Sequence, residues 1–503
     1  MATPCTRSSP RPLRAVLLLA GLLLALGGAA HGTAAAPKRK PAAPAPRVRT
    51  LPEALAATVG SVKGGIRDLS VSVVEVESGR EVYGYLADQP RVLASNTKLF
   101  TTAAAVDLLD PTFEFVTPLF ARGHLEAGVW KGDLAVVGSG DPNISGRFYD
   151  GDAYAVFRQW AAAVRALGAT KVDGDLYLVT GLFEPLKVHP DWPRDQLARW
   201  YEAPVDALSF SDNCVMVRIG PGKGPGSPGK VELVPDLKLY RLVANVTTTE
   251  SRKSHWLAIQ REPESGEIRV SGKVWSRAKP FEEWVSVPDP VTYFGAALRD
   301  AFREEGIEVA GLSWPVERLP DGEWREVARH RSDLPGTLAV INHRSQNFYA
   351  ESLLKVLGVA GGGNGSWRDG VEAVQGFLAR AGLADGVRLA DGSGMSRNNV
   401  ASPRHLAGLL RHMYFHPRGA TFVQSLPTSG GKEPAWRHRL AQPPYRGNVL
   451  AKTGTLSNVS TLSGYAKGRS GKLYAFSILA NNTSVWRAKR AQDSIVRAVI
   501  DHG

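Results

Sequence analysis

The segment SNTKLFTTAAAVDLLD (Ser95–Asp110) constrains the fold of this chain more than any other. Its apolar residues recur at helical intervals, which predicts a helix with a buried face. Ser95 stands at the N-cap end of this helix, and Lys98 follows three residues later. Residues three apart lie on the same side of a helix, so both side chains belong at its N-terminus. The fold must therefore present a serine and a lysine together where a helix begins.

A serine beside a lysine is a candidate nucleophile with its base. A serine hydroxyl becomes a good nucleophile only when a neighbouring base takes its proton. A lysine can be that base when burial and a nearby cation lower its pKa toward neutrality. The alternative is a solvated lysine one turn above an N-cap serine, and the segment alone does not decide between the two.

Four other copies of the Ser-x-x-Lys pattern are weaker candidates. Those at Ser227 and Ser429 lie in Gly-rich loops, and the copy at Ser276 is followed by a proline that disfavours a helix. Ser352 and Lys355 lie inside a predicted helix instead of at its start. Only the copy at Ser95 opens a helix.

Two further motifs carry groups suited to the same chemistry. Among three Ser-x-Asn patterns, only Ser345–Asn347 begins an amphipathic helix, and Lys452–Gly454 is the only Lys-Thr-Gly triplet. On a strand, Gly454 would let a ligand backbone approach because glycine has no Cβ. Lys452 and Thr453 would then offer a charge and a hydroxyl to a carboxylate. The alternatives are a helix cap for the first motif and an ordinary hairpin for the second.

The coarse order of elements is strands, helix, a long β-rich region, helices, strands and a final helix. Residues 69–86 alternate around Ser78-Gly79, which predicts two antiparallel strands. Residues 121–288 contain short strand-like runs between Gly and Pro turns, which indicates one or two inserted β-rich subdomains. We therefore expect an α/β domain with one sheet, split into residues 51–120 and 289–503.

The N-terminal 50 residues have the composition of a leader and a linker. Three arginines precede the 16-residue apolar run AVLLLAGLLLALGGAA, and small residues follow it, which is the order of a secretory signal peptide. The run is shorter than the roughly 20 residues of a spanning helix, and an uncleaved anchor is the alternative. We expect a signal peptide at 1–36 and a basic Pro/Ala-rich linker at 37–50. The protein would then be exported to the periplasm or cell envelope, where the linker would associate weakly with a membrane or wall surface.

Charge and cysteine content exclude several function classes. Of the net charge of +13, eight positive charges lie in residues 1–49, which contain no acid. The rest is only mildly basic and lacks a dense basic face with interleaved aromatics, so we expect no nucleic-acid partner. Cys5 and Cys214 alone cannot form a disulfide scaffold or a Cys-rich zinc site. His412 and His416 have helical spacing but no glutamate follows the first, so we expect no metal and no cofactor.

The three motifs, in this order, resemble those of the serine enzymes of the penicillin-binding and β-lactamase group. Within it, the sequence is most similar to the D-alanyl-D-alanine carboxypeptidase/endopeptidase type, the class C low-molecular-mass penicillin-binding proteins. The stretches that carry this resemblance are LASNTKLFTT, APVDALSFSDNCVMVRIGPG, RSQNFYAESLL, DGSGMSRNN and AKTGTLSNVSTLSGYA. It implies a β-lactamase/transpeptidase-like domain, with a central antiparallel sheet flanked by helices and a large insertion between Ser95 and Ser345.

The resemblance implies that Ser95 attacks the carbonyl of the penultimate D-Ala and forms an acyl-enzyme. Lys98 would be its base, and Ser345 would relay a proton to the leaving D-Ala. The backbone N–H groups of Ser95 and Thr455 would form the oxyanion hole.

The resemblance also implies how the substrate is held. Asn347 would bind the substrate amide, and Lys452 with Thr453, followed by Gly454, would bind the terminal carboxylate. Lys452 would also be the cation that keeps Lys98 neutral.

The implied function is a serine D-Ala-D-Ala carboxypeptidase and/or endopeptidase that acts on peptidoglycan stem peptides and is inhibited by β-lactam antibiotics. A β-lactamase is one alternative, but the Glu-x-x-Leu-Asn segment that positions water in class A enzymes is absent. A non-catalytic wall-binding protein on the same fold is the other, and the intact Ser95, Lys98 and Lys452 argue against it. Two departures from the family are Gln346, where Asp is common, and the segment KEPAWRHRL after SLPTSGG.

Overall fold

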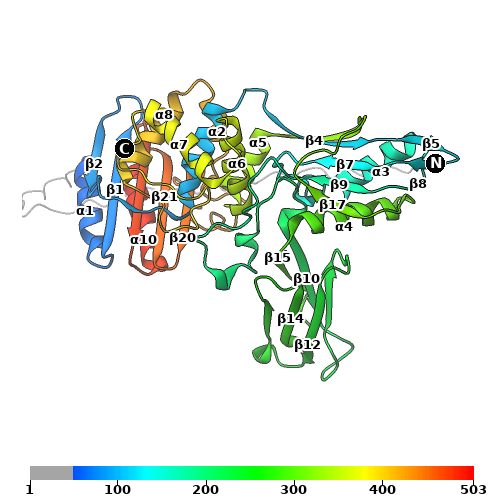
Figure 1. Ribbon diagram of the computed structural model, residues 1–503. Coiled ribbons are helices and arrows are strands. Elements are labelled where there is room, and N and C mark those ends of the chain that lie inside the picture. The colour runs from blue at the N-terminus through cyan, green and yellow to red at the C-terminus, as the bar shows by residue number, and fades with distance from the viewer. Residues whose placement is uncertain (1–48) are drawn as a thin grey trace, which may run out of the picture. The chain divides into compact units, whose positions relative to one another are not determined.

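The strands predicted at the start of the chain lie in a five-stranded antiparallel sheet, the central sheet, with the order β2-β1-β22-β21-β20 (Figure 1). The computed structural model describes residues 49–503. The strands are β1 (Asp68–Glu75), β2 (Glu81–Tyr85), β20 (Val449–Leu456), β21 (Val459–Lys467) and β22 (Leu473–Asn481). Because β1 pairs with β22, the first and last parts of the described chain belong to one sheet.

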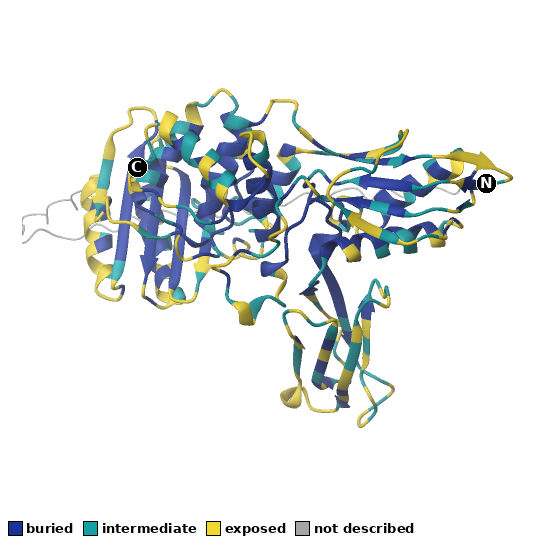
Figure 2. Cartoon of the chain, viewed as in Figure 1, coloured by how far each residue is buried: buried dark blue, intermediate teal, exposed yellow. Residues whose placement is uncertain are grey.

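Helices cover both faces of the central sheet. On one face, α1 (Leu51–Lys63) and α10 (Val485–His502) share an apolar core with strand residues such as Phe476 and Ile478. On the other face, α2 (Thr97–Leu108) and α8 (Pro403–Phe415) pack with Ala475 and Leu479. Alternate residues of β22 thus face opposite layers, and Figure 2 shows the strand buried along most of its length.

Helix α2 lies at the centre of the helical layer. It is surrounded by α5 (Leu334–His343), α6 (Asn347–Ala360), α7 (Trp367–Arg380) and α9 (Gly419–Gln424). The sequence predicts one buried face for this helix, but all residues from 97 to 106 are buried because neighbouring helices cover its other sides. The helix begins at Thr97, and Ser95 lies in the preceding 3₁₀ turn η1 (Ala94–Asn96) instead of at the N-cap.

A second sheet follows α2 in the chain, and its order is β17-β9-β7-β4-β18. Its first and last strands in the sequence, β4 (Glu114–Ala121) and β18 (Arg325–Asp333), pair with each other in antiparallel fashion. The other strands are β7 (Leu134–Val137), β9 (Leu176–Val179) and β17 (Ser313–Val316), and the helices α3 (Ala155–Ala166) and α4 (Pro290–Glu304) share a core with them. A smaller sheet contains β5 (His124–Glu126), β6 (Val129–Lys131), β8 (Lys171–Val172) and β16 (Glu308–Val309).

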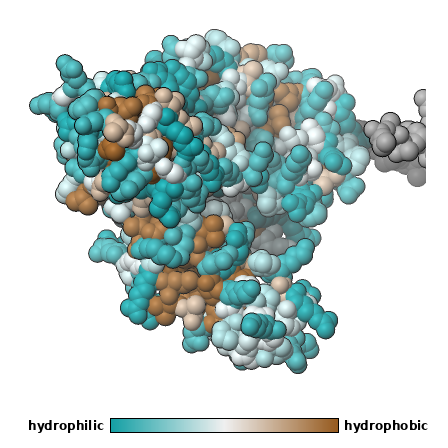
Figure 3. Space-filling view, turned by 90° about the vertical axis from the view of Figure 1, so that its right-hand side faces the viewer, coloured by the Kyte–Doolittle hydropathy of each residue, from teal (hydrophilic) through white to brown (hydrophobic). Residues whose placement is uncertain are grey.

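Two three-stranded sheets complete this part of the chain. One contains β10 (Cys214–Gly220), β11 (Lys230–Val234) and β15 (Phe281–Ser286), and the other β12 (Arg241–Thr249), β13 (Trp256–Arg261) and β14 (Glu267–Trp275). Figure 3 shows apolar side chains gathered on the surface in the lower half of the view. In and beside these two sheets, the apolar residues Val231, Leu237, Leu239, Leu242, Leu257 and Ile259 are only partly buried. A cavity of about 1060 Å³ lies between α4 and residues 236–238, and none of the predicted site residues lines it.

The α/β fold class, with a central antiparallel sheet flanked by helices and interrupted by a β-rich insertion, is confirmed. The predicted limits of the insertion, 121–288, differ from the strand pairing. Because β4 starts at Glu114 and pairs with β18 up to Asp333, we propose that residues 114–333 form the insert. Helix α4 belongs to it, although its helical pattern alone resembles that of the helices that follow.

Two predictions concern the N-terminus. The signal peptide at 1–36 and nearly all of the linker at 37–50 lie outside the described residues. Within residues 49–503, no helix is long and apolar enough to cross a membrane.

Candidate active site

Ser95 lies in a tight turn at the start of the central helix α2. Ala94 before it has φ +46°, a left-handed conformation that is uncommon for a residue with a Cβ. The side chain of Ser95 is half-buried, whereas its neighbours are fully buried. Strain of this kind is found often at functional sites, and here it accompanies a half-buried serine just before a helix.

Lys98 is fully buried and points its amino group at three oxygen atoms. Its Nζ lies 3.2 Å from Ser95 Oγ, 2.6 Å from Asn347 Oδ1 and 2.7 Å from the carbonyl oxygen of Ser393. None of these groups carries a charge. Burial lowers the pKa of Lys98 to about 7, and the carboxyl groups of Glu351 and Asp391 oppose this shift. The amine is therefore available in its neutral form near neutral pH.

The second motif begins helix α6 and joins the lysine to another loop. Gln346 is the N-cap residue, and its Oε1 accepts a hydrogen bond from Asn347 N. Asn347 accepts from Lys98 through Oδ1 and donates through Nδ2 to the carbonyl oxygen of Tyr201 at 2.8 Å. Its side chain thus bridges α2 and the segment that leads through the insert.

Ser345 lies between α5 and α6 in a left-handed conformation with φ +56°. Its Oγ accepts a hydrogen bond from Lys452 Nζ at 2.7 Å, and this Nζ also donates to the carbonyl oxygen of Thr453 at 2.8 Å. The contact joins the second and third motifs, which are 107 residues apart in the sequence.

The two lysines affect each other unequally. Burial is the main cause of the lowered pKa of Lys98, and the role of Lys452 as the cation that keeps Lys98 neutral stays a prediction. Burial and then the charge of Lys98 lower the pKa of Lys452 well below its usual value. Two buried ammonium groups in one site disfavour each other, and most of this effect falls on Lys452.

Gly454 lets strand β20 pack against the serine turn. A Cβ at this position would lie 2.9 Å from the backbone N of Ser95 and 3.0 Å from the carbonyl oxygen of Leu93. These atoms belong to the chain itself, so the packing alone requires a glycine here, and its expected role toward a ligand stays a prediction. This packing carries the next residue, Thr455, along the strand beside Ser95, and Thr455 is exposed.

Two buried carboxyl groups that support Lys98 were not among the predicted site residues, although the quoted stretches contain them. Glu351 accepts hydrogen bonds from Trp367 Nε1 at 2.8 Å and from the backbone N–H groups of Gly392 and Ser393 at 2.9 and 2.7 Å. It thereby fixes the loop whose Ser393 carbonyl oxygen receives a hydrogen bond from Lys98. Burial raises the pKa of Glu351 to about 7. Its position four residues after Asn347 on a helix was the available signal, because such residues share a face.

Asp391 holds the same loop from within. Its carboxylate accepts hydrogen bonds from Gly394 N at 2.7 Å, Ser396 N at 2.6 Å and Asn399 Nδ2 at 2.8 Å. The stretch DGSGMSRNN is therefore a wall of the lysine site, which its sequence alone did not reveal.

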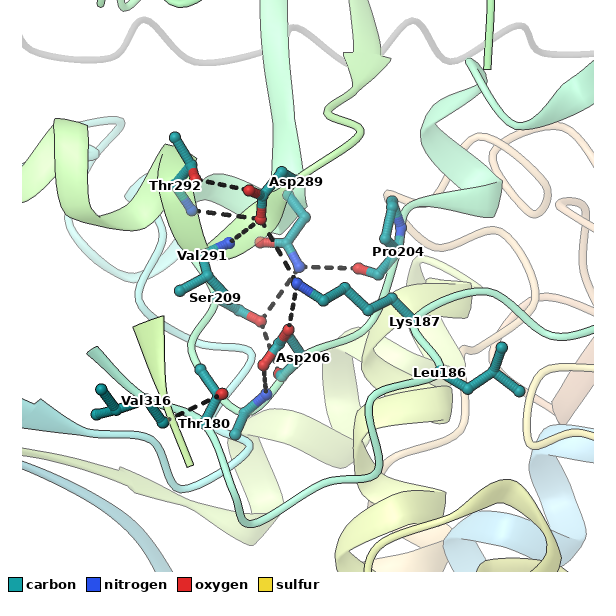
Figure 4. A network of polar contacts seen from close by, with 12 residues as sticks. Thr180, Leu186, Lys187, Pro204, Asp206, Ser209, Asp289, Val291, Thr292 and Val316 are labelled. Atoms are coloured by element: carbon teal, nitrogen blue, oxygen red, sulfur yellow. Dashed lines mark hydrogen bonds and ion pairs between the residues drawn. The ribbon is translucent and has the colours of Figure 1, made fainter. Parts of the chain in front are cut away.

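The segment that carries Tyr201 is anchored to the insert by the polar network in Figure 4. Lys187 Nζ lies 3.0 Å from Asp206 Oδ2 and 3.5 Å from Asp289 Oδ1. Asp289 also caps α4, since its side chain accepts hydrogen bonds from the N–H groups of Val291 and Thr292. Lys187 and Asp206, at the two ends of the segment 187–206, are thus linked to Asp289 at the start of α4. This linkage fixes the path of the chain past Asn347.

The arrangement is suited to acyl transfer. It combines a half-buried serine, an amine with a pKa near neutrality, a second serine bound to a second lysine, and a sheet edge beside the first serine. The histidines of α8 lie elsewhere: His416 contacts Asp107 at 3.3 Å, and the His405 ring contacts Ser402, the N-cap of the helix.

The model of the family described as D-Ala-D-Ala carboxypeptidase 3 (S13) matches residues 56–500 of this chain. The D-alanyl-D-alanine carboxypeptidase of Actinomadura sp. (strain R39) is 31% identical over 446 residues, which cover 84% of this chain and 80% of the relative. The D-alanyl-D-alanine carboxypeptidase DacB of Haemophilus influenzae is 28% identical, with 78% and 80% covered. The crystal structure of penicillin binding protein 4 (dacB) from Haemophilus influenzae matches with a TM-score of 0.74 at 25% identity, over 88% of this chain and 97% of that chain.

Proposed function

This chain belongs to the D-Ala-D-Ala carboxypeptidase 3 (S13) family of serine hydrolases, and from this premise we propose that Ser95 is its nucleophile. The substrates are peptidoglycan stem peptides that end in D-Ala-D-Ala. The products are the shortened peptide and free D-Ala, or two separated peptides where the leaving amine belongs to a cross-bridge. β-Lactam antibiotics acylate the same serine.

The contacts of Lys98 are the observation that carries the proposal. A neutral amine has two N–H groups and one lone pair. Its two N–H groups donate to Asn347 Oδ1 and the Ser393 carbonyl oxygen, so the lone pair is left for the hydroxyl of Ser95 at 3.2 Å. Lys98 therefore takes the proton of Ser95 while its Oγ attacks the carbonyl carbon of the penultimate D-Ala.

The oxyanion formed by this attack is stabilised by the backbone N–H groups of Ser95 and Thr455. The close approach of Gly454 to Ser95 supports this assignment, because it brings the two backbones together. When the tetrahedral intermediate collapses, the C–N bond breaks and Ser345 passes a proton to the leaving amine. Water then hydrolyses the acyl-enzyme, with Lys98 again as the base.

Lys452 and Thr453 bind the terminal carboxylate, and Asn347 binds the substrate amide. Burial and the charge of Lys98 lower the pKa of Lys452. A substrate carboxylate beside Lys452 favours its ammonium form, and this charge in turn favours the neutral form of Lys98. Substrate binding thus prepares the base.

The test is covalent labelling with fluorescent penicillin, followed by mass spectrometry of the labelled peptide. We expect stable labelling of the wild type at Ser95 and none in Ser95→Ala. A wild type that stays unlabelled at saturating drug would overturn the proposal. Rapid continuous hydrolysis of a chromogenic cephalosporin would assign the chain to the β-lactamases instead.

The proposal includes export across the cytoplasmic membrane to the periplasm or cell envelope. Its support is the charged, apolar and small-residue order of residues 1–36 and the location of peptidoglycan outside the cytoplasm. The basic linker at 37–50 gives weak association with an anionic membrane or wall surface. N-terminal sequencing of the protein from the envelope fraction tests this: a start near residue 37 is expected, and an intact N-terminus would indicate an anchor.

A further inference from the structure

A pocket of about 270 Å³ lies beside the turn of Ser345 and has no role in the reaction proposed above. The two residues that flank this serine, Arg344 and Gln346, both line it. Ser345 Oγ is in contact with Lys452, where the leaving amine would receive its proton and its carboxylate would bind. The pocket is thus adjacent to the leaving-group side of the site.

The floor of the pocket is held rigidly. Asp212 is only 9% exposed and accepts hydrogen bonds from Arg147 Nε and Gln346 Nε2, both at 2.8 Å. It lies in η5 (Ser211–Asn213), whose three residues have φ values of +51°, +57° and +52°. Such a run of left-handed residues persists only where the surroundings hold it. Asn213 provides part of this support, since its Nδ2 donates to the carbonyl oxygen of Pro204 in the network of Figure 4.

The walls carry two partly exposed indoles and two charged groups. Trp200, from η4 (Trp200–Glu202), and Trp284, from β15, are 36% and 42% exposed. Within residues 49–503, the guanidinium of Arg344 and the carboxylate of Glu283 form no hydrogen bond or ion pair. A free cation, a free anion and two indoles around one cavity suit a ligand with charged and apolar parts.

We propose that this pocket is the subsite for the second stem peptide of a cross-linked substrate, the peptide that leaves with its side-chain amine. The proposal rests on the function proposed above. Arg344 binds a carboxylate of that peptide, Glu283 accepts from its N–H groups, and Trp200 and Trp284 pack against its apolar side chains. Free D-Ala carries no second peptide for these four side chains to bind. The pocket therefore favours cleavage of cross-bridges over release of terminal D-Ala.

The chemistry is unchanged by this assignment. The Ser95 Oγ–carbonyl carbon bond forms, the amide C–N bond to the second peptide breaks, and the proton that Lys98 received reaches the leaving amine through Ser345. Water completes the hydrolysis, so no further reactant is needed.

The experiment compares two substrates with each variant: a purified cross-linked dimeric muropeptide and a monomeric pentapeptide. We expect Arg344→Gln to lower kcat/KM for the dimer by about tenfold, the size of a lost charge-assisted hydrogen bond. Trp284→Ala should lower it to a similar extent, and Arg344→Lys should restore part of the loss. D-Ala release from the monomer and acylation by penicillin should stay within about twofold of wild type.

Matched controls are Arg318→Gln and Trp256→Ala, because Arg318 is exposed and Trp256 is 53% exposed, and neither lines the pocket. Both should leave the two activities unchanged. Equal losses on dimer and monomer would overturn the assignment to the leaving-group side, and unchanged dimer cleavage would overturn the subsite. Failure of the proposed function is distinguishable, since the wild type would then resist penicillin labelling altogether.

Discussion

Two segments of this molecule share the Ser-x-x-Lys pattern and the same depth of burial, yet only one resembles an active site. Lys98 and Lys355 both have fully buried side chains, 0% exposed, on neighbouring helices. Lys98 contacts three uncharged oxygens. Lys355 forms an ion pair with Glu184 at 3.0 Å and lies 3.8 Å from the centre of the Trp367 ring. The partners of the two lysines differ, and their burial does not.

This difference shows why Lys98 is a better candidate for a base than Lys355. Burial lowers the pKa of both amines, but the carboxylate of Glu184 stabilises the ammonium form of Lys355 directly. The serines differ as well: Ser95 Oγ lies 3.2 Å from Lys98 Nζ, whereas the buried Ser352 Oγ has no hydrogen-bond partner within residues 49–503. The Ser-x-x-Lys pattern therefore indicates chemistry here only at the copy whose lysine lacks a counter-ion and whose serine is partly exposed.

The largest expected difference between the two Ser-x-x-Lys segments is in the effect of replacing each serine. Ser95→Ala should lower the rate of acylation by penicillin at least about a thousandfold, because the nucleophile is gone. Ser352→Ala should keep the wild-type rate within about twofold, since it removes a hydroxyl that makes no hydrogen bond. Stopped-flow or gel-based acylation rates measure both. Loss of labelling in a folded Ser352→Ala would contradict the distinction drawn here.

The two lysines should separate activity from stability. Lys98→Met should lower the acylation rate about a hundredfold or more and leave the unfolding temperature near that of wild type. Lys355→Met should keep acylation but cost about 3 kcal/mol of stability, because it leaves the Glu184 carboxylate without its cation. Denaturant unfolding and acylation rates on the same preparations test the pair. Loss of acylation in Lys355→Met with normal acylation in Lys98→Met would contradict the assignment of Lys98 as the base.

The pH dependence of the acylation rate should reflect the titration of Lys98 and should not depend on Lys355. Only the neutral amine can accept the proton of Ser95, so the rate should rise with pH and reach half its maximum near pH 7. Between pH 8 and pH 6 it should fall about tenfold, in line with the neutral fraction of an amine of that pKa. The midpoint should be the same in Lys355→Met, and a shift in that variant would show that the two lysines are linked.

The smallest expected effect is at Glu351, whose carboxyl group raises the pKa of Lys98 against the effect of burial. Glu351→Gln should therefore move the midpoint of the acylation profile to lower pH. It should also reduce stability by about 1–3 kcal/mol, since an amide cannot accept all three hydrogen bonds made by the carboxylate. The pH profile separates this role from a structural one: an unchanged midpoint would leave Glu351 as a support of the loop only.

The sequence alone predicts most of the geometry that depends on local spacing. Ser95 and Lys98 lie on one helical turn, so their contact follows from three residues of separation. The contact between Lys452 and Ser345 joins residues 107 positions apart in the sequence. The resemblance to the family implied that they lie in one site, whereas the hydrophobic periodicity did not. The fold class was predictable because the strands and helices have clear patterns at both ends of the chain.

Other features depend on tertiary contacts that no local pattern encodes. Gly454 is required by the backbone of Ser95, more than 350 residues away in the chain. In the sequence, Glu351 is an ordinary polar residue of an amphipathic helix. Only the structure shows that it accepts a hydrogen bond from the backbone of the loop at Gly392. Helix α4 has the same periodicity as α6, and only the pairing of β4 with β18 assigns it to the insert.

The pairing of β4 with β18 also bears on how such a chain can change over evolutionary time. Glu114 and Asp333 are partners in this ladder, so about 220 residues leave and re-enter the catalytic part at one point. The entropy of closing a loop grows only with the logarithm of its length, and each doubling costs about 0.6 kcal/mol. Sequence can therefore be gained, lost or exchanged beyond the ladder at little energetic cost, while Ser95 and Ser345 keep their separation. The ladder is a natural graft point, where new recognition modules can be added to an old hydrolase.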